Sequence, residues 1–288
     1  MKTTGVRQRS AWILAASLSC GCVLDTAGKD ACRTSADCVN DGTCWHGRCL
    51  SDPTWGCLGL GQPEEIDGLA VRLSVLDGST DLPIAGATVR LCPRADTLCE
   101  QPRSVTTTDD AGAVLLTLAD EYLELQAPGY RNHLAAGMTS LEVTTAGVSP
   151  LEVHFDLYTS AGFAALEADT GVVPDGQRGD VEVLVRDCLY ESAAGAHVQL
   201  DGIDAGTNLR YLVADLPSTD ATETDLASGS ALYFNVPPGL HSAAAEVFAT
   251  GAPVGGLGAG EAVLVRAGWV SHVAITPPGV LITDSGGD

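Results

Sequence analysis

Cysteine is the residue type in this chain with the greatest capacity for chemistry. The chain has ten cysteines, and seven of them precede position 58. Five lie in one short segment with the spacing Cys-x5-Cys-x5-Cys-x4-Cys-x7-Cys: Cys32, Cys38, Cys44, Cys49 and Cys57. A segment of about 26 residues buries too little apolar area to fold alone, so disulfide bonds must stabilise it. Its first four cysteines allow three pairings, and the sequence does not choose among them.

Three further cysteines follow this segment. Cys92 and Cys99 are seven residues apart and could close a loop through a disulfide bond. Cys57 and Cys188 would then remain as a possible covalent clamp, with a buried thiol at Cys188 as the alternative. Counting thus predicts that every cysteine from Cys32 onward is in a disulfide bond, as is usual in an oxidising compartment.

Metal binding is the main alternative chemistry for clustered cysteines and aspartates. The segment 32–57 has no Cys-x2-Cys pair, and its one histidine, His46, has no partner at zinc-ligand spacing. Asp169, Asp175 and Asp180 lie in a glycine-containing stretch, but proline occupies the position where an EF-hand calcium loop needs glycine. We therefore predict no metal site, and weak calcium binding at these loop aspartates stays an alternative.

No local pattern typical of a catalytic site occurs in the sequence. No two of the six histidines lie within five positions: His46, His133, His154, His197, His241 and His272. The chain also lacks a Gly-x-Ser-x-Gly nucleophile elbow and a Gly-x4-Gly-Lys-Ser/Thr phosphate loop. We predict no catalytic residue and no cofactor. A triad built from distant residues would leave no local motif, so that alternative stays open.

The composition excludes several classes of protein. The 288 residues include 15 Lys and Arg against 37 Asp and Glu, so the formal net charge is −22. A chain without a basic surplus cannot replace the counterions of a nucleic acid, so we expect no nucleic-acid partner. Hydrophobic residues make up 45% of the chain, which is too much for a disordered acidic tail and enough for a packed core.

Residues 1–21 have the layout of an export signal. Basic residues precede the apolar run 11–18, which is too short to cross a hydrocarbon core of ~30 Å as a helix. Small residues followed by cysteine resemble a bacterial lipoprotein signal, in which the cysteine is acylated. Cys22 is the expected lipidation site because it leaves an even number of later cysteines, and Cys20 is the alternative. We expect residues 22–31 to form a tether and the protein to reach the outer membrane or cell surface; secretion without lipid, or a periplasmic location, is the alternative.

One strand pattern occurs twice after the cysteine-rich segment. Apolar residues alternate in 69–75 and again in 181–185, which predicts strands with one buried face. In both copies a Gly-Ala-x-Val-x-Leu stretch, a Thr-Asp pair ahead of a glycine and a final alternating strand follow in the same order. Short strands separated by Gly, Pro, Asp and Thr are typical of antiparallel sandwiches, and the repetition indicates two domains of one kind.

The connections between strands carry further predictions. Each Thr-Asp pair is expected to form a tight turn in which the aspartate accepts hydrogen bonds from backbone amides ahead of it. The final strand 269–276 is expected to pair with 261–266 across an Ala-Gly turn, because glycine accepts a positive φ. Between the two copies, 160–168 is predicted to be a short helix with Ser160 as its cap.

The motif order in 68–158 resembles the carboxypeptidase regulatory-like family. Its residues are a strand ending in Asp, Pro-Ile-Ala-Gly-Ala-x-Val, Thr-Asp-x-x-Gly and Ala-Pro-Gly-Tyr; the resemblance is looser in 179–277, which has Val-Pro-Pro-Gly instead. The cysteine-rich segment resembles small EGF-like knots, and the whole arrangement is similar to myxobacterial-type surface lipoproteins. These resemblances imply transthyretin-like sandwiches and a non-catalytic accessory or binding module.

The patterns together predict a mainly β protein with two tandem Ig- or transthyretin-like antiparallel β-sandwiches. The predicted parts are a lipoprotein signal peptide (1–21), a tether (22–31), a cysteine-rich EGF-like segment (32–57), a first sandwich (66–158), a helical connector (159–178), a second sandwich (179–277) and a disordered tail (278–288).

The expected function is that of a non-catalytic, lipid-anchored envelope protein that binds or supports other components at the bacterial surface. Its partners would be the membrane, through the N-terminal lipid, and an unidentified protein or polysaccharide ligand. One alternative is an accessory or regulatory subunit that presents its sandwiches to an envelope enzyme. A secreted binding protein without lipid is another.

Overall fold

The computed structural model describes most of the chain beyond its N-terminal region. The described residues are 32, 35–38, 43–45, 48–50, 54–58, 69–118, 121–136, 150–189, 191–254 and 260–277. The predicted signal 1–21, the tether 22–31 with its lipidation candidate Cys22, the alternative Cys20 and the tail 278–288 lie outside them. Among the described residues, no helix is long and apolar enough to cross a membrane.

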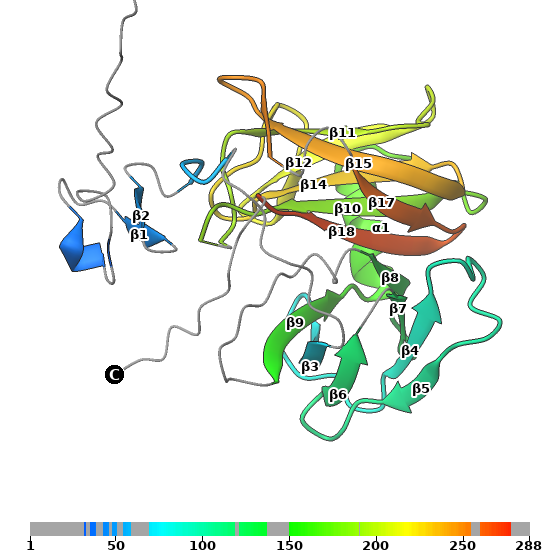
Figure 1. The fold of residues 1–288 in the computed structure, drawn as a ribbon. Coiled ribbons are helices and arrows are strands. Elements are labelled where there is room, and N and C mark those ends of the chain that lie inside the picture. The colour runs from blue at the N-terminus through cyan, green and yellow to red at the C-terminus, as the bar shows by residue number, and fades with distance from the viewer. Residues whose placement is uncertain are drawn as a thin grey trace, which may run out of the picture.

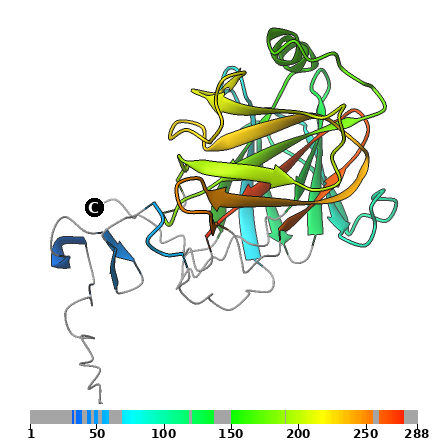
Figure 2. The same ribbon diagram turned by 90° about the horizontal axis from the view of Figure 1, so that it is seen from above.

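The cysteine-rich segment forms a small unit held together by disulfide bonds. It contains a 3-10 helix (Ser35–Asp37) and an antiparallel pair of β1 (Thr43–Trp45) and β2 (Arg48–Leu50). Two disulfides are formed, Cys32–Cys44 and Cys38–Cys49. Of the three pairings that the sequence leaves open, the structure forms the one that joins the first cysteine to the third and the second to the fourth. The β1–β2 pair lies to one side of the rest of the molecule (Figures 1 and 2).

The first sandwich packs two sheets against each other. Its strands are β3 (Leu69–Asp77), β4 (Thr88–Pro93), β5 (Ser104–Thr107), β6 (Ala113–Leu118), β7 (Glu121–Gln126), β8 (Asn132–Ala136) and β9 (Leu151–Leu157). One sheet has the order β6-β3-β9 and the other contains β8-β7-β4-β5. Val71, Leu73 and Val75 alternate along β3 and are fully buried in the core between the sheets. Burial of each such side chain stabilises the folded state by roughly 1.5–3 kcal/mol.

The second sandwich repeats the pairing order of the first. Its strands are β10 (Gly179–Val185), β11 (Ala196–Leu200), β12 (Asn208–Val213), β13 (Leu216–Ser218), β14 (Ser230–Val236), β15 (Gly239–Val247), β16 (Ala252–Pro253), β17 (Glu261–Val265) and β18 (Trp269–Ile275). The sheet order β14-β10-β18 corresponds to β6-β3-β9. In each sheet the strand that comes last in the sequence, β18 or β9, pairs in parallel with the strand that comes first, β10 or β3. Likewise, β11-β15-β17 corresponds to β4-β7-β8.

The two sandwiches share one sheet. β18 of the second sandwich pairs in parallel with β8 of the first, which gives a nine-stranded sheet of order β13-β12-β14-β10-β18-β8-β7-β4-β5 (Figure 1). Ala135 of β8 packs in the first core and pairs with His272, whereas the next residue, Val273, packs in the second core. Since neighbouring residues of a strand point to opposite faces, the two covering sheets lie on opposite faces of the shared sheet.

The predicted pairing of 261–266 with 269–276 is wrong. β17 pairs with β15, and β18 lies in the shared sheet between β10 and β8. The short turn between them still has its glycine, Gly268, at a φ of +77°, but it carries the chain from one sheet of the sandwich to the other. The reason is that β10 and β8 each offer β18 a backbone edge, so β18 is paired on both sides.

The predicted Thr-Asp turns are confirmed in both sandwiches. Asp109 accepts hydrogen bonds from two backbone amides ahead of it, both at 2.9 Å, and Asp225 accepts one at 2.8 Å. The hydroxyls of Thr108 and Thr224 each accept a backbone N–H at the start of the Gly-Ala-x-Val strand, at 2.9 and 3.0 Å. The glycine that closes each turn has a positive φ, +72° and +61°. These residues are therefore engaged in turn formation.

The connector contains the helix α1 (Ser160–Asp169), which Figure 2 shows at the upper edge of the molecule. The predicted cap, Ser160, is wrong by one position. Thr159 is extended, and its hydroxyl accepts the N–H of Gly162 at 3.0 Å, whereas Ser160 is already helical. Phe163 is fully buried against apolar residues of β12, β14 and β18, so α1 covers the face of the shared sheet that the second sandwich leaves open.

Candidate functional site at the junction of the two sandwiches

The junction around β8 and β18 contains buried polar side chains on both faces of the shared sheet. The buried polar residues near these two strands are Glu124, His133, Asp180, Glu182, Ser271 and His272. Ionisable groups are rarely buried without a partner, because they lose their hydration. Their concentration here makes the junction the candidate functional site of the described chain.

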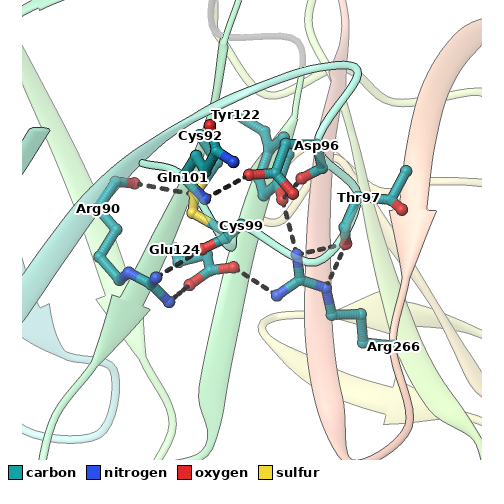
Figure 3. The surroundings of a disulfide bond; sticks show 9 residues. All are labelled: Arg90, Cys92, Asp96, Thr97, Cys99, Gln101, Tyr122, Glu124 and Arg266. Carbon is teal, nitrogen blue, oxygen red and sulfur yellow. Dashed lines mark hydrogen bonds and ion pairs between the residues drawn. A yellow bond between two sulfur atoms is a disulfide. The ribbon is translucent and has the colours of Figure 1, made fainter. Parts of the chain in front are cut away.

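Glu124 on β7 is completely buried and lies between two arginines (Figure 3). Arg90 on β4 approaches one carboxylate oxygen at 2.7 Å, and Arg266 donates to the other. Arg90 belongs to the first sandwich, while Arg266 lies in the β17–β18 turn of the second. Two hydrogen-bonded cations compensate the buried carboxylate for its lost hydration, so one charge network spans both sandwiches.

Arg266 has further contacts that hold it against the first sandwich. Its guanidinium donates to the backbone carbonyl of Thr97 at 2.9 Å and to the hydroxyl of Tyr122 at 2.6 Å. It also lies over the rings of Trp269 and Tyr122, at 5.2 and 5.6 Å from their centroids. Burial raises the pKa of Tyr122 to about 12, so its hydroxyl stays protonated and donates to the carbonyl of Asp96 at 2.5 Å.

The Cys92–Cys99 disulfide shapes the loop that supplies these carbonyls (Figure 3). The two Cα atoms are 5.3 Å apart, and both side chains are fully buried. Cys99 itself offers its carbonyl to Arg90 at 2.6 Å, and Thr97, two residues earlier, offers its carbonyl to Arg266. The disulfide therefore holds two acceptors in place for two arginines.

A chain of hydrogen bonds occupies the other face of the shared sheet. The N–H of Tyr158 donates to Nε2 of His133 at 3.2 Å, Nδ1 of His133 is 2.6 Å from Nε2 of His272, and Nδ1 of His272 is 3.0 Å from Glu182. Because Nε2 of His133 accepts, its proton is on Nδ1, which donates to His272; Nδ1 of His272 then donates to Glu182. Burial, with the neighbouring imidazole second, holds the pKa of His133 well below its usual range.

An ion pair lies beside this chain. Arg131, just before β8, contacts Asp180 of β10 at 2.6 Å, and the guanidinium lies 4.8 Å from the centroid of the Phe163 ring. Asp180 also accepts the backbone N–H of Asn235 at 3.0 Å. Burial raises the pKa of Asp180 to about 6, although the amide of Asn235 and Arg131 oppose the shift. This pair is a second charged contact between the sandwiches.

The hydrogen-bond chain lacks the parts of a catalytic relay. It starts at the backbone amide of Tyr158 and reaches Glu182, which also accepts from the Tyr158 hydroxyl at 3.5 Å, so among the described residues no Ser, Thr or Cys nucleophile accepts or donates at either end. Within the described residues, two groups have ligand atoms close enough to share an ion: Cys32, Cys38 and Cys49, and Cys92, Cys99 and Glu124. All of these cysteines are in disulfide bonds and offer no thiolate.

A surface pocket of about 370 Å³ lies away from the junction, on the outside of the first sandwich. It is lined by Arg72, Asp109, Ala113, Val114, Leu115 and Pro150. Asp109 already accepts two backbone amides in its turn, and Arg72 lies 3.7 Å from Glu152 on β9. The pocket therefore gathers no group that is free for acid–base chemistry.

The fourth disulfide, Cys57–Cys188, joins the N-terminal segment to the second sandwich. Its Cα atoms are 5.8 Å apart although the two residues are 131 positions apart in the sequence. The two sulfurs are buried against Leu50, and the N–H of Cys188 donates to the carbonyl of Thr54 at 3.1 Å. The structure thus forms both bonds that counting suggested for the later cysteines, and leaves no thiol at Cys188.

The aspartates weighed for calcium do not converge. Asp175 is 3.4 Å from Arg178 and accepts the N–H of Gln177, and Asp180 pairs with Arg131. Both carboxylates are therefore satisfied by donors from the protein. Asp169 lies at the end of α1.

The central residues of the junction carry no local signal in the sequence. Glu124 lies on β7 of the first sandwich and Arg266 in the β17–β18 turn of the second, 142 positions apart in the sequence. Glu124 is completely buried and Arg266 is partly exposed, and they meet across the two sandwiches. His133 and His272 are 139 positions apart, so their contact depends on the pairing of β8 with β18.

No protein-family model matches the chain, and no curated protein matches it. Solved structures show only a distant likeness to this chain. The shaft pilin SpaA from Lactobacillus rhamnosus GG is 13% identical with a TM-score of 0.22, and the match covers 75% of this chain and 99% of that one. The Bacillus anthracis TIE protein is 10% identical with a TM-score of 0.23, covering 73% and 34% of the two chains.

A third likeness is to the group B streptococcus pilus 2b backbone protein, at 16% identity and a TM-score of 0.24, covering 34% of this chain and 43% of that one. This chain therefore spans less than half of the streptococcal and Bacillus proteins. TM-scores this low carry no argument about fold or function.

Proposed function

We propose that the chain is a non-catalytic module of the bacterial envelope, anchored by lipid at Cys22 or, alternatively, Cys20. In this proposal its sandwiches bind a protein or polysaccharide at the cell surface, or support such a component. The observation that carries the proposal is that the ionisable groups at the junction contact other protein groups between the two sandwiches. Glu124 pairs with Arg266 on one face of the shared sheet and His133 contacts His272 on the other, so both contacts join the two sandwiches, and none of these residues lines the surface pocket of the first sandwich.

The disulfides support an extracytoplasmic location. All eight cysteines of the described residues are oxidised, which is typical of an oxidising compartment. Cys57–Cys188 also ties the N-terminal segment covalently to the loop that follows β10. A lipid at the N-terminus would thereby connect the second sandwich to the membrane through the N-terminal segment, which suits a surface module.

The experiment is a comparison of binding and turnover with the full-length protein extracted from envelopes in detergent. Intact mass is measured first, and the proposal expects an acylated N-terminal cysteine. The same preparation is tested for retention on envelope polysaccharide and on envelope proteins, and for hydrolysis of peptide, ester and glycoside substrates. Retention without turnover supports the proposal.

Two results would contradict parts of the proposal separately. An unmodified N-terminus beyond Cys22 removes the lipid anchor and leaves a secreted binding protein. Turnover that survives further purification removes the non-catalytic assignment. Stoichiometric co-purification with an enzyme whose activity depends on this chain would instead identify an accessory subunit.

A further inference from the structure

The strand pair that joins the sandwiches brings two histidines from different sandwiches into direct contact. His133 of β8 and His272 of β18 are stacked, with ring centroids 4.9 Å apart and an interplanar angle of 21°. His133 is completely buried and His272 is 7% exposed. Phe155 of β9 lies edge-on against both rings, at 6.1 and 4.6 Å. Water therefore cannot separate the two imidazoles without movement of the strands.

The direction of the hydrogen bonds leaves no place for an additional proton. Nε2 of His133 accepts from the backbone of Tyr158, and Nε2 of His272 accepts from His133. A proton added to either nitrogen converts an acceptor into a donor that faces another donor. The remaining ring nitrogens already carry protons. Protonation of either ring must therefore break a contact of the chain.

The surrounding charges do not relieve this constraint. Arg131 and Tyr158 lie near His133, and Asp156 and Glu182 lie near His272. The charged groups next to these neighbours are His154, Glu167, Asp180, Asp81 and Asp215. Arg131 adds a positive charge near His133. Glu182 accepts from the side of His272 that points away from His133. A cation between the two rings thus meets no acceptor.

We propose that this histidine pair makes the union of the two sandwiches sensitive to acid: proton uptake opens the β8–β18 pairing, and the connector then holds the sandwiches as two separately moving bodies. The protein is one rigid unit near neutral pH and a hinged one in acid. The lowered pKa of His133 has the sign that this proposal requires. A histidine whose pKa is depressed on folding stabilises the folded state fully above its ordinary pKa of about 6.5, and this stabilisation is lost as the pH falls.

Hydrogen exchange measured by mass spectrometry on the full chain tests the proposal. Peptides covering β8 and β18 are compared at pH 7.5 and 5.5, with exchange times scaled for the intrinsic effect of pH. Peptides from β3 and β14, the inner strands of each sandwich, serve as internal references. The expected result is loss of protection in β8 and β18 alone, with the opening constant rising about tenfold per pH unit below about 6.5 for one proton.

Variants assign the response to the pair. His133→Gln keeps an acceptor and a donor but does not titrate, and His133→Phe fills the same space; either should keep β8 and β18 protected at pH 5.5. His197→Gln is the matched control, because His197 is half-exposed beside Glu246 and should respond as wild type. The proposal is overturned if wild-type β8 and β18 stay protected at pH 5.5, if all strands lose protection together, or if the folded His133 variants still respond.

Discussion

Replacement of Arg266 by alanine should weaken the connection between the sandwiches more than any exposed arginine could. The substitution removes one of the two cations that compensate Glu124, which is completely buried. It also removes the donor to the carbonyl of Thr97 and the cation over the ring of Trp269. Breaking a buried ion pair costs roughly 3–5 kcal/mol, and the remaining contact from Arg90 places the expected loss at the lower end, about 3 kcal/mol.

Urea unfolding followed by tryptophan fluorescence measures this loss, because Trp269 lies directly beside Arg266 at the junction. Wild type should unfold in one transition, and Arg266→Ala should show a lower midpoint or two separate transitions. Arg72→Ala is the matched control, because Arg72 is half-exposed and 3.7 Å from an exposed glutamate, a contact worth about 0–1 kcal/mol. Equal losses for the two variants would refute the assignment of Arg266 to the junction.

Two further predictions concern covalent and backbone constraints. Cys57→Ser combined with Cys188→Ser should cost about 2–5 kcal/mol of stability and make the segment before the first sandwich susceptible to limited proteolysis; unchanged protease resistance would contradict a covalent clamp. Gly112→Ala should lower the thermal midpoint much more than Gly86→Ala. Both glycines have a φ of +72°, but a Cβ at Gly112 would lie 2.8 Å from a carbonyl oxygen of β3, whereas nothing lies within 4 Å at Gly86. Equal shifts would show that the crowding at Gly112 has no energetic effect.

Features set by near neighbours in the chain could be predicted from the sequence. The alternation predicted for 69–75 corresponds to the strand β3, in which Val71, Leu73 and Val75 are buried because a period of two places them on one face. Asp109 and Asp225 accept amides a few residues ahead, so their turns depend on local geometry alone. The disulfide Cys92–Cys99 closes a loop short enough to be found by counting.

Features set by distant partners could not be predicted. Ser271 and His272 are polar yet buried, because β18 is covered on both faces and paired on both edges. Such a strand loses the alternation that marks a half-exposed one. The choice of β15 as the partner of β17 likewise depends on how the whole sandwich closes, and a short turn with glycine does not distinguish it from a hairpin. Glu124 and Arg266 meet only after β8 and β18 have paired.

The continuity of the nine-stranded sheet is the central claim of this account, and amide exchange resolved by residue in β18 tests it most directly. β18 is paired with β10 on one edge and β8 on the other. The amides of residues 270–274 should all exchange slowly near neutral pH, as in an inner strand. Fast exchange at every second amide of this stretch would mark β18 as an edge strand and contradict the union of the two sandwiches.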